Sequence, residues 1–373
     1  MATDATVLLT GFPGFLGSAL LPRLLARGEG PVACLVQPHH RETAEQRLSA
    51  VLDAGRERTE TSERSGESAD LPPVRLVEGD ITEPDLGLGE TRASLLGVDT
   101  VYHLAAVYDL AVERAVGEAV NVDGTRHMLD FATDAGVDRF HYVSTCYVSG
   151  RYDGVFTERH LREGQSFNNH YEATKYRAEV AVREAIKTGL PATVYRPAIV
   201  VGDSRTGETG KFDGPYHFFR VLDAQPGPVS VVPRLPGAAR TELNVVPRDF
   251  VVDAIAALSG RADTAGETFQ LCDPAPATVP GFVDAVADAM NQRAVAVPAP
   301  KPVVRRGMRA LDRVVATEPA TVDYFDHPTR YANPATQRAL ADTDLRCPPL
   351  ATYVDRLVDY YRRHPDERVE AMI

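Results

Sequence analysis

The chain opens with a strand-like segment, a glycine-rich turn and a helix-like segment, and this order restricts the fold more than any other feature of the sequence. Residues 7–10 form a short apolar run, residues 11–17 read Gly-Phe-Pro-Gly-Phe-Leu-Gly, and residues 18–27 carry a helical pattern. Glycines allow a tight turn and let the backbone approach a pyrophosphate, which the positive end of the following helix attracts. The G-x-x-G-x-x-G spacing therefore predicts a dinucleotide cradle, although it also fits a strand–helix turn without a ligand.

Strand-like and helix-like segments continue to alternate after this turn. Further strands are expected over residues 32–36, 74–77, 99–106, 139–145 and 192–202, and helices over residues 42–54 and 112–135. This alternation predicts an α/β fold of the Rossmann type, a doubly wound parallel sheet with right-handed crossovers. Such sheets bind ligands beyond the carboxyl ends of their strands. Four residues are predicted at those ends: Gly11, Asp80, Ala105 and Thr145.

The second half of the chain predicts a smaller unit. We expect a dinucleotide-binding domain over residues 1–202, to which elements within 245–275 add, and an α/β substrate lobe with a helical tail over 203–373. The glycine-rich loop 203–215 suggests a lid over the substrate. Its Arg205 and Lys211 either meet phosphates of a coenzyme A or carrier-protein arm or are simply solvated.

Other segments allow more than one interpretation. Residues 56–70 are charged and almost without apolar side chains, which predicts a surface insertion. The aromatic residues Phe12, Tyr108 and Tyr147 either face a substrate pocket or fill the core.

Tyr171 and Lys175 are four residues apart, which places both on one face of a helix. A cation beside a phenol favours the phenolate and lowers the tyrosine pKa from about 10. Such a phenol can exchange a proton with a carbonyl oxygen near neutral pH. The chain has 4 lysines against 36 arginines (40 − 4), so a lysine at this position is notable.

Charge and cysteine content exclude several classes of protein. The net charge of −12 argues against nucleic acid as a partner, because phosphate contacts need clustered cations. The 4 cysteines form no C-x-x-C pair, so neither a metal site nor a disulfide framework is expected, and a reducing cytoplasm is the expected location. We expect neither a signal peptide nor a membrane span, because no apolar run is long enough.

The residues after the second strand bear on the choice of cofactor. An acidic residue there favours the ribose hydroxyls of NAD, whereas arginine favours the 2′-phosphate of NADP. The segment reads Gln37-Pro38-His39-His40-Arg41 and contains no acid. NADP(H) is therefore favoured over NAD(H), with Arg41 and one of the histidines as phosphate partners. The histidine pair is equally consistent with a solvated loop.

Several motifs together resemble the extended short-chain dehydrogenase/reductase family. The motifs are TGFPGFLG at 10–17, GDI at 79–81, HLAA at 103–106, NVDGT at 121–125, YVST at 142–145, YEATK at 171–175 and YRPAIVVG at 195–202. Within that family the chain is most similar to the thioester-reductase or fatty-acyl reductase (male-sterility-like) branch. The resemblance implies an enzyme that uses NADPH to reduce acyl thioesters to aldehydes or alcohols. It implies a small-molecule substrate, held as a coenzyme A or carrier-protein thioester.

The resemblance also assigns roles to individual residues. Thr145 matches the catalytic hydroxyl, with Ser144 as the alternative; Tyr171 matches the proton donor, and Lys175 the residue that binds the nicotinamide ribose and lowers the tyrosine pKa. The implied cofactor-binding residues are Gly11, Gly14, Phe15, Leu16, Gly17, Gln37, Arg41, Asp80, Ile81, Leu104, Ala105, Ala106, Asn121, Tyr171, Lys175, Pro197 and Ile199.

Two departures keep other interpretations open. Gln37 stands where the acyl-reductase branch often has arginine, which leaves the NADP preference unsettled. The 25 residues between Thr145 and Tyr171 also suit nucleotide-sugar epimerases or dehydratases and 3β-hydroxysteroid-dehydrogenase-like enzymes. A third interpretation, a non-catalytic nucleotide sensor, is disfavoured because such proteins commonly lack the Tyr–Lys pair. The helical tail suggests either part of the substrate pocket or a homodimer face.

Overall fold

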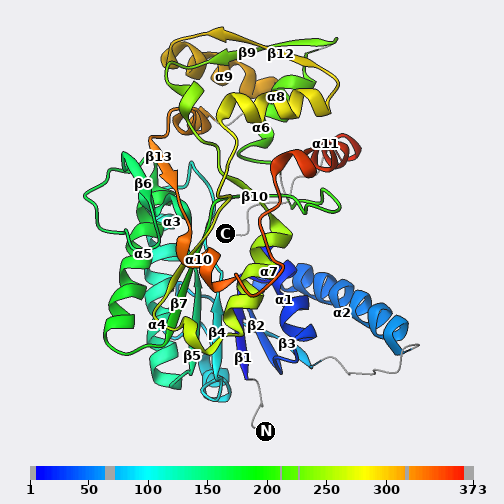
Figure 1. The fold of residues 1–373 in the computed structure, drawn as a ribbon. Helices are drawn as coiled ribbons and strands as arrows, with labels where there is room; N and C mark the ends of the chain where they lie inside the picture. The colour runs from blue at the N-terminus through cyan, green and yellow to red at the C-terminus, as the bar shows by residue number, and fades with distance from the viewer. Residues whose placement is uncertain (1–5, 64–71, 211, 226, 316–318, 365–373) are drawn as a thin grey trace.

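A central sheet of seven parallel strands organises the molecule (Figure 1). The computed structural model describes residues 6–63, 72–210, 212–225, 227–315 and 319–364. The strands lie in the order β11-β7-β5-β4-β1-β2-β3. Their bounds are β1 Val7–Thr10, β2 Val32–Val36, β3 Val74–Glu78, β4 Thr100–His103, β5 Arg139–Val143, β7 Ala192–Pro197 and β11 Thr268–Leu271. The predicted doubly wound α/β fold is confirmed.

The sheet reverses its winding between β1 and β4, which are neighbours in the sheet although β2 and β3 separate them in the chain. The apolar side chains of β1 and β2 are buried along the whole of both strands, as expected for a parallel sheet covered on both faces. Ligands bind outside the carboxyl ends of the strands at such a reversal. This edge therefore places the candidate site.

Helices cover both faces of the sheet. Helices α1 (Phe15–Ala26) and α7 (Arg248–Ser259) pack together on one face, where apolar side chains of both join the core. Helices α4 (Gly124–Ala135) and α5 (His170–Lys187) cover the other face. The chain leaves the sheet after β7, enters the second lobe, and then returns to the sheet with α7 and β11.

Two helices begin and end at residues other than those expected from the sequence. The helix expected over 42–54 is α2 (Arg41–Glu63), which extends into the predicted insertion; the rest of that segment, 64–70, lies outside the described residues. The helix expected over 112–135 consists of α3 (Arg114–Gly117), a π-helical turn (Glu118–Asp123) and α4. Asn121 lies in the π-helical turn, a form often found at functional sites.

The second lobe lies beyond the sheet, at the top of Figure 1. It contains a two-stranded parallel sheet, β9 (Val229–Arg234) with β12 (Arg293–Pro298). Its helices are α6 (Tyr216–Asp223), α8 (Val279–Ala289), α9 (Lys301–Val315) and α11 (Val354–Arg363). Apolar side chains of α6, α8 and α11 form one cluster.

The segment between α9 and α11 runs back onto the central unit. Strand β13 (Thr329–Tyr331) pairs with β6 (Gly154–Phe156), and α10 (Pro334–Ala339) packs on β11. Strand β8 (Ile199–Val201), the continuation of β7, pairs with β10 (Val245–Pro247) just before α7. Among the described residues, no helix combines the length and the apolar character needed to cross a bilayer.

Candidate active site

Tyr171 and Lys175 lie in the first two turns of α5. The helix begins after Asn169, whose side chain accepts a hydrogen bond from the Glu172 backbone N–H at 3.0 Å, a typical N-cap. Both side chains are buried, Tyr171 at 7% exposed and Lys175 at 2%. Lys175 Nζ donates to the Val143 carbonyl at 2.9 Å and lies 4.6 Å from the centre of the Tyr142 ring.

The predicted lowering of the tyrosine pKa is wrong for this structure. Burial raises the pKa of Tyr171 well above 10; a hydrogen bond with Thr145 lowers it in part, and the charges of Glu172 and Asp213 raise it further. Lys175 points its ammonium at the end of β5 instead. Tyr171 is therefore a protonated phenol, which suits a proton donor.

Lys175 is itself perturbed. Burial lowers its pKa to about 7, even though the charge of Glu179 raises it. His103, buried between β4 and its neighbours, stays neutral because burial and then the charge of Lys175 lower its pKa to about 3. Its ring bonds to Thr10 at 2.8 Å and to Thr125 at 3.1 Å, so it connects β1, β4 and α4.

Thr145 follows β5 and caps the short 3₁₀ helix Cys146–Ser149. Its hydroxyl accepts from the Tyr147 backbone N–H at 3.2 Å and donates to the Pro197 carbonyl at 3.4 Å, and it lies close enough to Tyr171 to lower the pKa of that phenol in part. The neighbouring Ser144 hydroxyl instead donates to the buried carboxylate of Glu179 at 2.7 Å. The structure thus brings Thr145 to Tyr171 and turns Ser144 towards the helix behind it.

Asn121 fixes the backbone beside this pair. Its side-chain oxygen accepts from the Val107 N–H at 2.9 Å, and its amide donates to the Val107 carbonyl at 3.3 Å and to Thr174 Oγ1 at 3.0 Å. Gly117, in the preceding turn, leaves room for Thr174: a Cβ at Gly117 would lie 3.2 Å from the Thr174 methyl group. The π-helical turn is therefore joined directly to α5.

The glycine turn packs too tightly for any other residue at two positions. A Cβ at Gly11 would lie 2.8 Å from the Ala105 nitrogen, and one at Gly17 would lie 2.4 Å from the Gly11 carbonyl oxygen. Gly14 donates its N–H to the Gly11 carbonyl at 2.9 Å, and Phe15 and Leu16 then begin α1. The turn and the positive end of α1 suit a diphosphate.

The end of β4 forms the other side of the turn. The backbone N–H groups of Leu104 and Ala105 donate to the Thr10 hydroxyl at 3.2 and 3.1 Å. Ala105 and Ala106 are half-buried beyond the strand end. Pro197 is the last residue of β7, and Ile199 is the first residue of β8. The Pro197 carbonyl accepts the hydrogen bond from Thr145, and Ile199 lines a pocket.

Asp80 and Ile81 lie after β3, at the adenine end predicted by the resemblance. Asp80 accepts from the N–H and hydroxyl of Thr82, both at 2.8 Å, and from the Gln37 amide at 3.0 Å. Burial raises the pKa of Asp80, but these hydrogen bonds outweigh burial and hold it below its ordinary value. The Ile81 carbonyl bonds to the His127 ring at 2.8 Å.

Arg41, the predicted phosphate partner, is paired with carboxylates of this chain. Its guanidinium lies 2.7 Å from Glu45 and 3.5 Å from Glu78. The His39 and His40 rings lie in the short 3₁₀ helix before it, with their centres 4.0 Å apart and their planes tilted by 50°. A 2′-phosphate would have to compete with two carboxylates for Arg41, and the geometry alone does not select NADP.

An apolar pocket opens beside Tyr171. The central unit contributes Tyr108, Leu110, Tyr147, Tyr171 and Ile199, and the second half of the chain contributes Gly214, Pro215, Phe218, Leu243, Thr321, Tyr324 and Phe325. None of these described residues is charged. Tyr108 packs edge-on against Tyr171, with ring centres 5.0 Å apart. Phe12, in contrast, is buried in the core next to α1.

Sequence reasoning missed the pocket residues of the short 3₁₀ helix Pro319–Tyr324. The Tyr324 hydroxyl donates to the buried Glu172 carboxylate at 2.6 Å and accepts from the Asn169 amide at 2.9 Å. The Thr321 hydroxyl is buried in the pocket wall without a hydrogen-bond partner among the described residues. No local motif marks these residues, because only the returning chain brings them to Tyr171.

The loop proposed as a lid is attached at several points. Ser204 donates its N–H and hydroxyl to Asp249 at 2.8 and 2.6 Å, and Arg356 donates to the Ser204 carbonyl at 3.1 Å. Arg205 is 74% exposed and lies 4.0 Å from Asp249 and Asp253. Lys211 lies outside the described residues.

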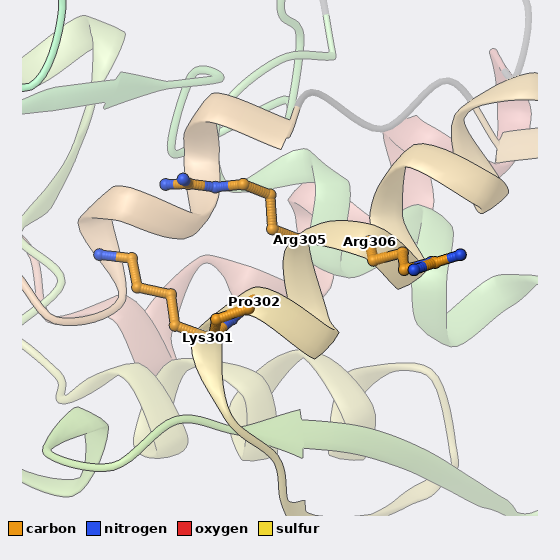
Figure 2. Close-up of a pocket in the computed structure, with 4 residues that line it drawn as sticks. All are labelled: Lys301, Pro302, Arg305 and Arg306. Carbon is orange, nitrogen blue, oxygen red and sulfur yellow. The ribbon is translucent and has the colours of Figure 1, made fainter.

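A second hollow, on α9, lacks the features of an active site. It is lined by Lys301, Pro302, Arg305 and Arg306 (Figure 2). Figure 2 shows Lys301 and Arg305 on one side of the helix and Arg306 on the other. Lys301 and Arg305 pair with Asp323, and Lys301 also with Asp326, so carboxylates balance two of the three cations.

A glycine turn at the winding reversal, beside a buried Tyr–Lys pair and a threonine hydroxyl, defines an NAD(P)-dependent oxidoreductase of the extended short-chain dehydrogenase/reductase type. The family model described as Male sterility protein matches residues 9–255, which is more than half of the chain. The chain belongs to that family, and the predicted branch is confirmed.

Known relatives agree with this assignment. The chain is 26% identical to a linear gramicidin synthase of Brevibacillus parabrevis over 97% of its own length and 7% of the relative. It is 29% identical to the carboxylic acid reductase of Mycobacterium tuberculosis over 72% of the chain and 24% of that protein. The chain thus spans a small part of these curated relatives.

Solved structures are similar over nearly all of the chain. The terminal R domain from the myxalamid PKS-NRPS biosynthetic pathway superposes with a TM-score of 0.78 at 26% identity, covering 98% of this chain and 92% of that domain.

Proposed function

We propose that this protein reduces an acyl thioester to an aldehyde, or an aldehyde to an alcohol, with NADPH as the reductant. The observation that carries the proposal is that the Thr145 hydroxyl lies close enough to the buried Tyr171 to affect its pKa, and that Tyr171 lines an uncharged pocket. The matched relatives include a carboxylic acid reductase and a gramicidin synthase, which supports acyl chemistry. The thioester is held on coenzyme A or on a carrier protein.

When bound, the nicotinamide cofactor supplies the hydride. The Thr145 and Tyr171 hydroxyls donate hydrogen bonds to the substrate carbonyl oxygen, on which negative charge develops. Tyr171 then gives its proton to that oxygen, which turns an aldehyde directly into an alcohol. A thioester gives a hemithioacetal at this point; its C–S bond then breaks, the hydroxyl proton passes to sulfur, and the thiol leaves as the aldehyde forms. Lys175, whose ammonium donates to the Val143 carbonyl, would hold the nicotinamide ribose when the cofactor binds.

The pocket favours an uncharged acyl group next to the reacting carbon. Burying a charged substituent there costs free energy because no described residue of the lining carries an opposite charge. The Thr321 hydroxyl offers one hydrogen bond to an uncharged polar substituent. The acyl group therefore enters between Tyr108 and the 3₁₀ helix Pro319–Tyr324.

Preference for NADPH over NADH is part of the proposal. It is supported by the absence of an acid in residues 37–41, and it requires the phosphate to displace Glu45 or Glu78 from Arg41. We expect Arg41→Gln to raise the Kd for NADPH and to leave that for NADH unchanged.

The test is nucleotide oxidation with a panel of acyl-coenzyme A thioesters, aldehydes and UDP-sugars. We expect NADPH consumption with thioesters or aldehydes and none with UDP-sugars. Conversion of a UDP-sugar without net consumption of nucleotide, with NAD retained through purification, would instead identify an epimerase.

A further inference from the structure

Arg248 faces the glycine turn from the start of α7, and neither the motifs nor the resemblance assigns it a role. Its guanidinium carbon lies 4.9 Å from the centre of the Phe15 ring, and its side chain is 14% exposed. Phe15 is the first residue of α1, next to the backbone amides that form the predicted diphosphate cradle. A largely buried cation therefore lies beside the positive end of α1, and the Phe15 ring contact leaves its N–H groups available to an anion.

The anion now beside Arg248 is the carboxylate of Glu208. The two groups are 3.5 Å apart, and the glutamate side chain is 46% exposed. A single contact of this length with a half-exposed carboxylate is worth little free energy. Arginine binds phosphate oxygens more strongly, through two parallel charge-assisted hydrogen bonds.

Glu208 belongs to the loop 203–210, which brings its carboxylate to Arg248. The loop is attached to α7 through the hydrogen bonds between Ser204 and Asp249. At Gly207 it lies against α11 so closely that a Cβ would be 2.1 Å from the Arg356 carbonyl oxygen. At Gly210 it reaches the turn, where a Cβ would be 3.2 Å from the Phe15 ring.

We propose that Arg248 binds the diphosphate of the dinucleotide cofactor. In this proposal the Glu208 carboxylate forms its ion pair with Arg248 only while the cofactor is absent. Binding exchanges the Glu208 carboxylate for phosphate oxygens, and the released carboxylate stays in solvent at the rim. Arg248 and the α1 N-terminus would together neutralise the diphosphate charge. The inference rests on the proposed function only in requiring a nicotinamide dinucleotide as ligand.

The exchange predicts opposite effects for its two partners. Arg248→Gln removes a charge-assisted contact, so the Kd should rise at least about tenfold. Because NADPH and NADH share the diphosphate, both values should rise by the same factor, unlike the effect of Arg41→Gln. Glu208→Gln removes the competitor, so both Kd values should fall by a few fold. Arg248→Lys keeps the positive charge but loses the two parallel N–H donors of the guanidinium. Its Kd values should lie between those of wild type and Arg248→Gln.

The experiment is isothermal titration calorimetry, in which the cofactor-free protein is titrated with NADPH and, separately, with NADH. The matched control is the exposed pair Arg162 and Glu184, 2.6 Å apart and outside the site. Arg162→Gln and Glu184→Gln should leave both Kd values unchanged. Thermal melting checks that every variant is folded.

Three outcomes overturn the inference. An unchanged Kd in a folded Arg248→Gln variant makes Arg248 a structural contact of the loop. Weaker binding by Glu208→Gln makes Glu208 a ligand or support instead of a competitor. Failure of the wild-type chain to bind either nucleotide removes the proposed function as well, which separates that failure from the other two.

Discussion

Burial affects the pKa of Tyr171 more than Lys175, four residues along the helix, does. The helix spacing correctly places Lys175 one turn away, but the ammonium donates to Val143 and burial raises the phenol pKa. A neutral phenol donates its proton in the reductive direction without prior protonation. Thr145 lies beside this proton source and lowers its pKa in part.

Replacement of Tyr171 by phenylalanine tests this role. Tyr171→Phe removes the proton donor and one of two hydrogen bonds to the substrate carbonyl, so kcat should fall about 100-fold or more. The Kd for NADPH should stay within about twofold of wild type. Single-turnover kinetics and nucleotide titration measure the two quantities. Turnover near the wild-type rate would exclude Tyr171 as the donor.

The pH dependence of stability tests the burial of Lys175. Its pKa is about 7 in the folded, cofactor-free protein and 10.5 as the ordinary value. Between these values the unfolded chain binds more protons, so the free energy of unfolding contributed by this residue rises as the pH increases. Lys175→Met removes that contribution.

Thermal melting of both proteins at pH 7 and pH 9 makes the comparison. The melting temperature of wild type relative to Lys175→Met should increase between the two values. An equal difference at both pH values would mean that the ammonium is not desolvated.

At the scale of elements, hydrogen bonds of Tyr324 to Glu172 and Asn169 join the pocket wall to the start of α5. Tyr324, in the 3₁₀ helix Pro319–Tyr324, donates to Glu172 in the first turn of α5. Burial raises the pKa of Glu172, while its hydrogen bonds with Tyr324 and Asn168 lower it, so the carboxylate depends on these partners. The hydrogen bond keeps the returning segment against the catalytic helix.

Tyr324→Phe should therefore loosen the pocket wall. Loss of a hydrogen bond to a buried carboxylate costs about 1.5–3 kcal/mol. The KM for the acyl substrate should rise several fold, whereas the Kd for NADPH should not change. Tyr353→Phe is the matched control, because its buried hydroxyl has no hydrogen-bond partner among the described residues. Equal effects of the two variants on KM would exclude a specific role for the Tyr324–Glu172 contact.

At the scale of the whole molecule, the second half of the chain is joined to the edge of the central sheet. Gln270 in β11 donates to the carbonyls of Phe156 and Ala332, and Asn333 donates to the Cys272 carbonyl. The Thr336 hydroxyl donates to the Gln270 carbonyl. These contacts couple the returning segment to the unit that holds the glycine turn.

This coupling predicts that NADPH stabilises both halves together. At a concentration 100 times its Kd, a ligand adds about 2.7 kcal/mol to the free energy of unfolding. Calorimetry should show one transition that shifts upward by a few degrees. A separate transition that NADPH leaves in place would show that the second lobe unfolds independently.

The sequence alone determined the sheet, the glycine turn and the Tyr–Lys pair, because short-range patterns encode them. Apolar runs between helical segments predict buried parallel strands, and Gly11, Thr145 and Tyr171 follow from motifs of a few residues. Only the tertiary structure decided which groups surround these motifs. Thr321 and Tyr324 reach the pocket, and Arg248 and Glu208 reach the turn, through contacts between segments far apart in the chain. The pKa of Tyr171 depends on burial by those segments, so spacing within one helix could not predict it.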